Sequence, residues 1–486
     1  MMMTTSPPDS NERRVFEIKA LILGIFVFFV LAQLGYWLRI DFFGNETGAW
    51  SYVYTDWLID YSAGFVRRGL SGELIGLLSP LVPPRIVIAS LTWSIFGILT
   101  VAYIRSVGRS LDKLTPTVLI GLLFLPSLLP FYIYDHGAFG RKETIGFLIL
   151  VWHLYLLEAP RNREPTRYIK KIIPMSLVAL PVHVLIHEAS FFLFVPVHLL
   201  ISHAIIRQDD SVGSYRKFFT LPLVYLPVCL SFLVVFLFGH PSFEVAAAIC
   251  KNWELLGELG PGRCVLDDQG VLEALGGFGL GAEVLEDKVI SSTSVSTFSA
   301  LTGLAWTFSQ ASSMVISLSA DTLLSWVLTS AILGFCTLYI GSMVIDTLRR
   351  GGSTRSFDPT ALAAPHARVL NLKYFFVPLL VSAPLYIVGA DFGRWVAVTC
   401  INYMLIILSK DIVLTELEHA KFSRGNTEQK SRVINSSVPT LGFYGNLLVF
   451  LFILFYLRLP HCCIRDFGMF EEPLRTIIRV LPHIFG

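Results

Sequence analysis

Long runs of apolar residues, each about the length of a membrane-spanning helix, recur along the chain between short polar segments. A helix needs about 20 mostly apolar residues to cross the hydrocarbon core of a bilayer. The pattern therefore predicts about eleven transmembrane helices. Their expected positions are residues 18–38, 84–104, 117–134, 143–158, 172–187, 189–206, 218–239, 323–346, 374–390, 395–412 and 438–457.

The composition agrees with lipid as the surroundings of this chain. Of the 486 residues, 54% are hydrophobic and 15% are charged, whereas a soluble domain carries about 25% charged residues. The formal net charge of +2 is too small to favour nucleic acid as a partner. The sequence thus predicts an all-α integral membrane protein in contact with the lipid bilayer, with no nucleic-acid partner.

The distribution of basic residues predicts the orientation in the membrane. Cytoplasmic loops carry an excess of Lys and Arg. If the N-terminus is cytoplasmic, the inside segments hold 24 of the 38 Lys and Arg residues. We therefore expect a multi-pass protein of the bacterial inner (cytoplasmic) membrane, with a cytoplasmic N-terminus and an extracytoplasmic C-terminus.

The expected spans divide the chain into five regions. Residues 1–17 are predicted to form a cytoplasmic disordered tail, and residues 18–239 an N-terminal membrane region that contains a first outer loop (39–83). Residues 240–322 are predicted to form a large extracytoplasmic segment, residues 323–457 a C-terminal membrane region and residues 458–486 an extracytoplasmic tail. The first outer loop is predicted to end in an amphipathic or re-entrant helix within Ser71–Val82. The Ser/Thr-rich stretch Ser291–Ala320 either lies at the membrane surface or re-enters the membrane.

Two cysteines fall in the large extracytoplasmic segment. Disulfides form in oxidising compartments, and Cys250 and Cys264 are close enough in sequence to close a short loop. We therefore predict a disulfide between them, with two free thiols as the alternative.

Four groups of polar residues border the spans, and the predicted orientation places all four on the extracytoplasmic side. They are Asp56 and Asp60 with Arg67 and Arg68; Asp135 with Arg141, Lys142 and Glu143; His183 with His187 and Glu188; and Asp391 with Arg394. Ionisable residues near the bilayer are costly and often functional. Their common side predicts one polar cavity that opens outward. The alternative for each group is local: a loop ion pair, an interfacial turn, packing histidines and an isolated ion pair.

The residue types in these groups limit the chemistry. Carboxylates can accept a proton from a hydroxyl group or hold a divalent metal. Arg and Lys bind phosphate through charge-assisted hydrogen bonds. Asp60 is the first candidate for a general base, followed by Asp56, because both precede the Arg pair in one loop, and Glu188 is the third. The candidate substrate-binding residues are Arg67, Arg68, Arg141, Lys142, His187, Asp391 and Arg394. No cofactor is predicted with certainty, and a divalent metal is possible.

Several of these segments resemble a pattern shared by little-characterised bacterial multispan membrane proteins associated with surface polysaccharides. The segments are YSAGFVRRGL at 61–70, GRKE at 140–143, His187-Glu188 and DFGRW at 391–395. The overall plan, with acidic residues in the first outer loop, many spans and a later large outer segment, resembles the GT-C class of integral membrane glycosyltransferases. In that class a catalytic acidic residue commonly lies in the first outer loop. The resemblance therefore implies a catalytic role for Asp56 or Asp60.

The resemblance and the residue chemistry favour glycosyl transfer outside the membrane. The expected donor is a sugar linked to polyprenyl phosphate, the acceptor is a glycan or another hydroxyl compound, and the product belongs to a surface polysaccharide or glycoconjugate. Three alternatives stay open: a polysaccharide polymerase or ligase, a membrane acyltransferase with His187 as base, and a transporter or structural membrane protein without enzymatic activity. The sequence does not identify the donor sugar, the acceptor or the oligomeric state.

Overall fold

The computed structural model describes residues 10–39, 56–159, 164–207, 214–239, 320–349, 365–388 and 392–410, together with residues 245, 248–249, 251–252, 412–413, 416 and 457–459. Every regular element in these ranges is a helix. This confirms an all-α membrane protein for the described part of the chain. Five predictions lie almost wholly outside these ranges: the disulfide between Cys250 and Cys264, the location of Ser291–Ala320, the span at 438–457, the tail 458–486 and the side chain of Asp391.

Among the described residues, five helical stretches are both long and apolar enough to cross a membrane. They are Arg13–Gly35 within α1 (Ser10–Leu38), Pro84–Gly108 (α4), Pro165–Ile186, Thr220–Phe238 within α12 (Ser214–Phe238) and Leu323–Arg349 within α17 (Ala320–Arg349). The third stretch is continuous and consists of α9 (Pro165–Pro174), the π-helical turn η3 (Met175–Ala179) and α10 (Leu180–Ile186). Because α1 begins at Ser10, residues 10–17 of the predicted N-terminal tail are helical.

The other predicted spans within the described residues are shorter or interrupted helices. They are α5 (Pro116–Phe124) with α6 (Pro130–Tyr134); α8 (Thr144–Leu156); α11 (Ser190–Ile206); α18 (Pro365–Asn371), η5 (Leu372–Phe376), α19 (Val377–Val381) and α20 (Ala383–Val388); and α21 (Phe392–Leu408). The break between α5 and α6 lies at Pro126 and Pro130. Proline lacks the amide hydrogen that a helix requires and clashes with the preceding turn. The total of about eleven spans stays a prediction.

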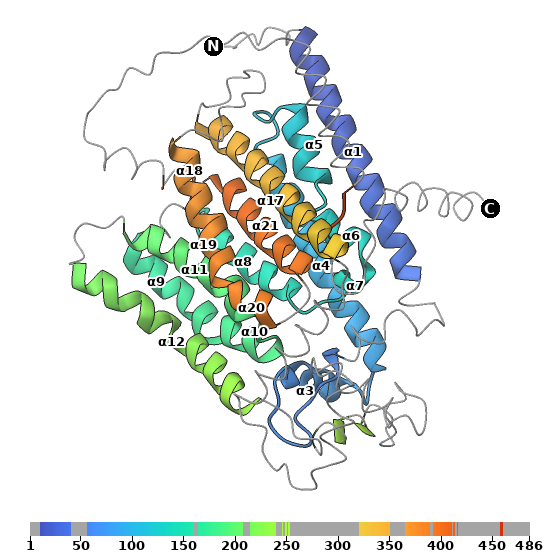
Figure 1. The fold of residues 1–486 in the computed structure, drawn as a ribbon, viewed down its shortest axis with the longest axis vertical. Helices are drawn as coiled ribbons and strands as arrows, with labels where there is room; N and C mark the ends of the chain where they lie inside the picture. Colours follow the sequence, from blue (N-terminus) through green and yellow to red (C-terminus); the bar gives the residue numbers. More distant parts are fainter. Residues whose placement is uncertain are drawn as a thin grey trace, which may run out of the picture.

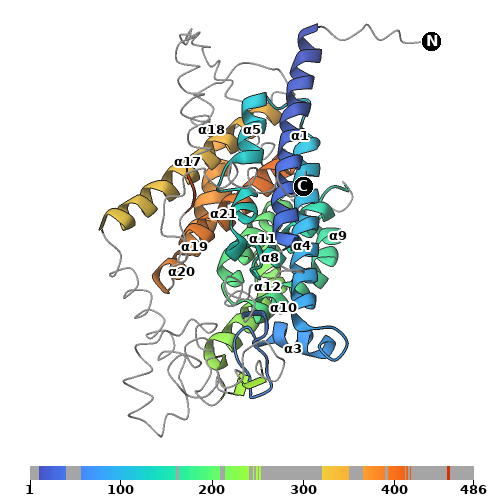
Figure 2. The same ribbon diagram turned by 90° about the vertical axis from the view of Figure 1, so that its right-hand side faces the viewer.

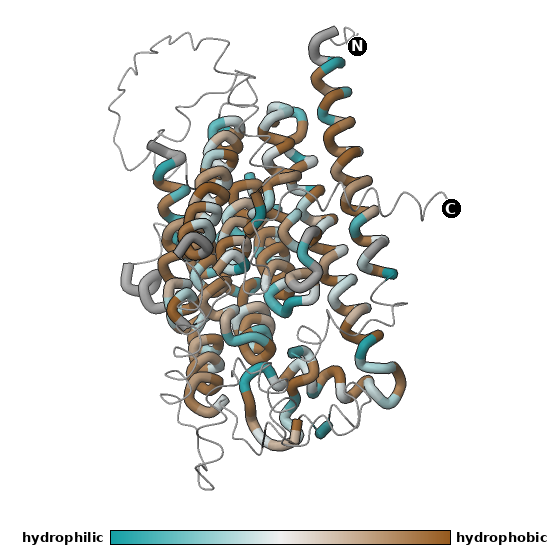
Figure 3. The backbone as a smooth tube through the Cα atoms, turned by 45° about the vertical axis from the view of Figure 1, so that its right-hand side comes forward, coloured by the Kyte–Doolittle hydropathy of each residue, from teal (hydrophilic) through white to brown (hydrophobic). Residues whose placement is uncertain are grey.

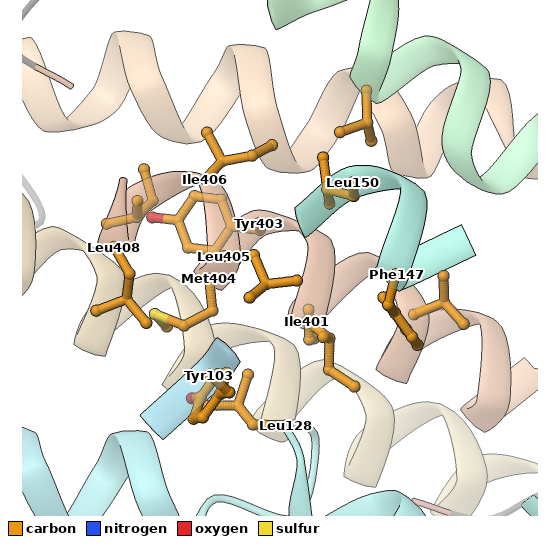
Figure 4. Packing of buried hydrophobic residues seen from close by; sticks show 14 of the residues in the cluster. Tyr103, Leu128, Phe147, Leu150, Ile401, Tyr403, Met404, Leu405, Ile406 and Leu408 are labelled. Carbon is orange, nitrogen blue, oxygen red and sulfur yellow. The ribbon is translucent and has the colours of Figure 1, made fainter. Parts of the chain in front are cut away.

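The helices form a bundle around α21 (Figure 1, Figure 2). Helix α21 packs against α17, α11, α8 and α4, and nearly all of its side chains are buried. Figure 4 shows its apolar side chains next to Tyr103 of α4 and Leu150 of α8. The peripheral helices differ, because α1 and α12 expose large apolar residues such as Leu21 and Leu223. Apolar positions run along the outer helices (Figure 3), as expected of helices in contact with lipid.

Helix α3 (Gly69–Leu78) lies at one end of the bundle, where α4 begins and α12 ends (Figure 1). It packs against α10 and α4, and it lies largely within the predicted range Ser71–Val82. The preceding loop approaches α3 closely, because the Gly72 amide donates a hydrogen bond of 3.0 Å to the Ile59 carbonyl. A Cβ atom at Gly72 would lie 2.2 Å from that oxygen, so only glycine fits. This contact fixes the segment that precedes α3 against the helix.

Candidate functional site

Arg68 joins two segments that are far apart in the sequence. Its Nη1 atom donates to Asp56 Oδ1 at 3.0 Å. Its Nε and Nη2 atoms donate to Glu188 Oε2 at 2.9 Å and Oε1 at 2.8 Å. Glu188 lies between α10 and α11, which places its carboxylate beside the N-terminus of α3. The two-point contact with Glu188 fixes both the position and the plane of the guanidinium group.

Lys142 connects the loop between α7 (His136–Phe139) and α8 to the same place. Its side chain is fully buried, and its Nζ atom donates to the Asp56 carbonyl at 2.5 Å and lies 3.5 Å from Asp56 Oδ2. The Trp57 indole donates to the Gly140 carbonyl at 2.7 Å, and its ring lies 5.8 Å from Lys142 Nζ. Asp56 therefore contacts two cations, Arg68 from its own loop and Lys142 from the loop between α7 and α8.

Glu143 contacts Arg394, which lies in the first turn of α21. Arg394 Nε lies 3.1 Å from Glu143 Oε1, and His187 Nε2 lies 3.4 Å from Glu143 Oε2. The other imidazole nitrogen, His187 Nδ1, lies 3.9 Å from Glu188 Oε2. The His187–Glu188 pair thus connects the Arg68 contacts to those of Arg394.

These contacts unite residues from all four groups that the sequence singled out. We call the set the ionic cluster; its members are Asp56, Arg67, Arg68, Arg141, Lys142, Glu143, His187, Glu188 and Arg394. Arg67 Nη1 lies 3.8 Å from Glu188 Oε1, and its backbone amide donates to the Gly239 carbonyl at 2.8 Å. Arg141 is buried and acts electrostatically on Asp56 and Glu143. With five cations and three carboxylates, the cluster has an excess of positive charge when His187 is neutral.

The charges in the cluster shift the pKa values of their neighbours. Burial raises the pKa of the Asp56 carboxyl, but Lys142 and Arg68 outweigh this and hold the pKa below its ordinary value. Burial likewise opposes ionisation of Glu188, and Arg68 and Arg67 lower its pKa well below the usual range. Burial lowers the pKa of Lys142 to about 8 against the attraction of Asp56. Asp56 and Glu188 are therefore ionised at neutral pH and are poor proton acceptors.

The cluster has a buried layer and a partly exposed layer. The Asp56, Lys142 and Glu143 side chains are 4%, 0% and 1% exposed. The exposed fractions of the other side chains in ion pairs are larger, at 19% for Glu188, 14% for Arg68, 12% for Arg67 and 11% for Arg394. A ligand that approaches the cluster would therefore meet three arginines and the Glu188 carboxylate, which contacts two of them.

The backbone at Arg68 is strained. Its φ angle of 65° makes it the one non-glycine residue in the described part of the chain with a positive φ. Such a conformation costs about 1–3 kcal/mol and persists where surrounding contacts impose it. The two carboxylates on its guanidinium group supply those contacts. In this conformation Arg68 occupies the N-cap position of α3, and its side chain points into the cluster.

Asp60 lies in the same loop but has a different set of partners. Its Oδ1 atom accepts hydrogen bonds from the Ser62 amide at 3.0 Å and the Ser62 hydroxyl at 2.5 Å. The Asn252 side-chain amide donates to Oδ2 at 2.5 Å. Within the described residues, Asp60 makes no ion pair with Arg67 or Arg68, and Asp56 takes that place. Neither partner of Asp60 was predicted from the sequence, although a serine two residues after an aspartate is a recognised turn pattern.

His183 and Asp135 support the cluster from outside it. His183 Nε2 lies 3.0 Å from Ser190 Oγ and 3.3 Å from the Lys142 carbonyl. Gly146 makes this approach possible, because a Cβ atom there would lie 2.6 Å from the His183 ring. Asp135 Oδ1 accepts a hydrogen bond of 3.3 Å from the Ala138 amide at the start of α7. Both residues therefore order the loops that carry Lys142 and Glu143.

A metal site is a separate possibility that the sequence left open. The described residues contain no group of three or more His, Cys, Asp or Glu side chains that could hold a metal ion. The three carboxylates of the cluster are paired with Arg, Lys or His instead.

Residues 21–255, just under half of the chain, match a protein family described as "Uncharacterised membrane protein Rv1490". The matched range contains every member of the ionic cluster except Arg394. No curated protein and no solved structure matches the chain. The family match supports a membrane protein and carries no information on glycosyl transfer.

Proposed function

We propose that the ionic cluster binds the phosphate of a polyprenyl-phosphate-linked sugar and that the protein transfers this sugar to a hydroxyl acceptor at the extracytoplasmic surface of the bacterial inner membrane. The observation that carries the proposal is the set of three partly exposed arginines, Arg67, Arg68 and Arg394. The three carboxylates of the cluster hold them in place. Planar guanidinium groups match phosphate oxygens and stay charged at any physiological pH. The product would enter a surface polysaccharide or glycoconjugate.

The proposed reaction needs a proton acceptor beside the phosphate site. The base removes the proton of the acceptor hydroxyl, the oxygen attacks the anomeric carbon, and the bond to the phosphate oxygen breaks with its electron pair on the phosphate. Asp60 is our candidate for the base, because its hydrogen-bond partners in the described residues are uncharged. Asp56 and Glu188 are bound to cations and are better suited to positioning Arg68.

Helix α3 supports a substrate that carries a lipid. Its residues Leu74 and Leu77 are exposed, as is Leu81 just beyond its end. These side chains follow directly after Arg68, at the same end of the bundle. A face of this kind is stable in the acyl region of a membrane, close to the headgroups. Immersion of α3 in the outer leaflet would therefore place a lipid-linked phosphate at the height of the cluster.

The proposed orientation, with the N-terminus inside, can be tested at the two ends of α4. Ser79 is partly exposed and Asp112 is exposed, and the two residues flank this helix on either side. In a variant without the seven native cysteines, we expect Ser79→Cys to react with a membrane-impermeant thiol reagent in intact cells. Asp112→Cys should react only after the membrane is permeabilised. The reverse labelling pattern would place the cluster in the cytoplasm and contradict the proposal.

The phosphate site can be tested without knowledge of the sugar. Polyprenyl phosphate is the product common to all donors of this class, and the uncharged polyprenol of equal length is the matched control. We expect the purified protein in nanodiscs to bind polyprenyl phosphate at least about tenfold more tightly than polyprenol, because hydrogen bonds to charged groups contribute about 1.5–3 kcal/mol. Native mass spectrometry measures both. Equal affinities would refute a phosphate site.

A further inference from the structure

A chain of buried polar side chains runs through the interior of the bundle, away from the ionic cluster. His153 Nδ1 of α8 lies 2.8 Å from His198 Nδ1 of α11, and His153 Nε2 lies 2.5 Å from the Tyr168 hydroxyl of α9. The Tyr168 hydroxyl lies 2.7 Å from Ser202 Oγ, which in turn lies 2.8 Å from the Tyr225 hydroxyl of α12. Four helices therefore contribute to one continuous hydrogen-bonded chain.

This chain has the chemistry of a proton path. Each imidazole and hydroxyl group can both donate and accept a hydrogen bond, which is the property that proton transfer along a chain requires. Polar groups of this kind are expensive inside a membrane helix, and in transporters and pumps they mark proton relays. The His153 and His198 rings are fully buried in helices that are otherwise strongly apolar.

The chain extends toward the ionic cluster. His198 interacts electrostatically with His183, which contacts Ser190 and the Lys142 carbonyl. His183 also acts on His187, a member of the cluster. His198 Nε2 and His183 Nδ1 are buried, and neither has a hydrogen-bond partner within the described residues. These two nitrogens are therefore available for hydrogen bonds, but they do not bond to each other in this structure.

The other end of the chain approaches a pair of charged residues. Tyr374 of η5 interacts electrostatically with Tyr168 and donates a hydrogen bond of 2.9 Å to Glu416 Oε1. Glu416 also pairs with Lys373, and His203 near the end of α11 interacts with both. Along α11, His203 stands thirteen positions after Ser190, a rise of about 20 Å. The Lys373–Glu416 pair therefore lies well away from the ionic cluster.

We propose that His183, His198, His153, Tyr168 and Tyr374 form a proton pathway between the ionic cluster and the Lys373–Glu416 pair. In each step a nitrogen or oxygen atom takes up a proton from one neighbour and releases one to the next, so positive charge moves and no electron is transferred. The His183–His198 and Tyr168–Tyr374 steps are not hydrogen bonds in this structure, and each requires the two side chains to rotate into hydrogen-bonding distance. The branch through Ser202 and Tyr225 holds the Tyr168 hydroxyl in place. The pathway goes beyond the proposed sugar transfer and does not depend on it.

Proton flux through the purified full-length protein tests this inference. The protein is reconstituted into phosphatidylethanolamine–phosphatidylglycerol vesicles that contain a pH-sensitive dye, with potassium and valinomycin to clamp the membrane potential. After an external acid pulse, we expect the vesicles to acidify faster than vesicles without protein. Tyr168→Phe should lower the protein-dependent flux about tenfold, because the missing hydroxyl interrupts the chain and adds a barrier to one transfer.

Tyr103→Phe is the matched control. Tyr103 is also a buried tyrosine, but its hydroxyl donates to the Leu122 carbonyl at 2.7 Å, outside the pathway. We expect this variant to conduct protons like the unaltered protein. His198→Gln provides a second interruption if Tyr168→Phe does not fold. Wild-type flux equal to that of empty vesicles, or equal flux in the Tyr168→Phe and Tyr103→Phe variants, would overturn the inference.

The two proposals can fail separately. The flux is measured without any lipid-linked sugar, so it is independent of sugar transfer. Conversely, Tyr168→Phe should bind polyprenyl phosphate as the unaltered protein does, because Tyr168 lies outside the ionic cluster. Loss of flux with unchanged binding is the result that a proton pathway predicts, whereas a purely structural role would impair both.

Discussion

Asp60→Asn is expected to lower sugar transfer from a polyprenyl-phosphate hexose by about 10²–10⁴-fold, the range typical for removal of a general base. The amide retains the shape of the side chain, and its oxygen can still accept the hydrogen bonds from Ser62. Its nitrogen takes the place of Oδ2 and can donate to Asn252 once the Asn252 amide rotates to present its oxygen. The loop and the cluster beside it should therefore keep their structure. Binding of polyprenyl phosphate should be largely unchanged, which separates loss of chemistry from loss of binding.

Release of radiolabelled sugar from the donor by purified protein measures this effect. Ser62→Ala is the matched control, because it removes a hydrogen bond to Asp60 and leaves the carboxylate. We expect a far smaller loss of turnover for Ser62→Ala than for Asp60→Asn. If Asp60→Asn, Asp56→Asn and the double variant all retain full activity, the base is elsewhere, with Asp391 as the next candidate and Glu188, whose pKa is strongly lowered, after it.

Arg68→Ala is expected to weaken the binding of polyprenyl phosphate by about 10²-fold or more, since truncation of one partner of a buried charge pair costs about 2–5 kcal/mol. The change removes a guanidinium group that would contact the phosphate. It also leaves the carboxylates of Asp56 and Glu188 with fewer cations. Nanodisc binding and thermal stability should therefore both fall. Arg109→Ala, which removes an exposed ion pair with Glu158, is the matched control and should change neither.

A double variant distinguishes the direct effect of Arg68 from the indirect one. Arg68→Ala combined with Glu188→Gln also removes the charge of the carboxylate that loses its two-point partner in the single variant. We expect the double variant to regain thermal stability without regaining phosphate binding. If binding returns with stability, or if Arg68→Ala binds polyprenyl phosphate like Arg109→Ala, Arg68 does not contact the phosphate.

Some features of the site could be predicted from the sequence because they are local. The helix within Ser71–Val82 follows from an apolar stretch between turn residues, and α3 occupies most of that range. The GRKE segment was expected at a loop before a helix, and Lys142 and Glu143 do precede α8. Charges next to apolar runs are conspicuous, so the sequence also identified the residues that form the cluster.

The pairing of these charges could not be predicted. Asp56 and Asp60 stand four residues apart in one loop with the same two arginines behind them, and sequence alone favoured Asp60 as their neighbour. The direction of a side chain in an irregular loop depends on the contacts of its backbone, here on the fit of Gly72 against Ile59. That fit turns Asp56 toward Arg68 and Lys142 and leaves Asp60 with Ser62 and Asn252.

The hydrogen-bonded chain of polar side chains in the bundle interior was even harder to predict from the sequence. His153 and His198 stand alone in apolar stretches, and a single histidine in such a stretch is usually a packing residue. Their hydrogen bond joins two helices whose residues are 45 positions apart, and no periodicity in either helix indicates it.

The sequence by itself determined that this chain is a helical membrane protein, because the length and apolar character of its runs are properties of each segment alone. It also determined which charged residues stand at the ends of helices. Only the tertiary structure decided which carboxylate meets which cation, since ion pairs such as Arg68–Glu188 join residues 120 positions apart. Such pairs form only when the packing of α3, α10 and α21 brings the helix ends together, and that packing depends on side-chain fit across the whole bundle.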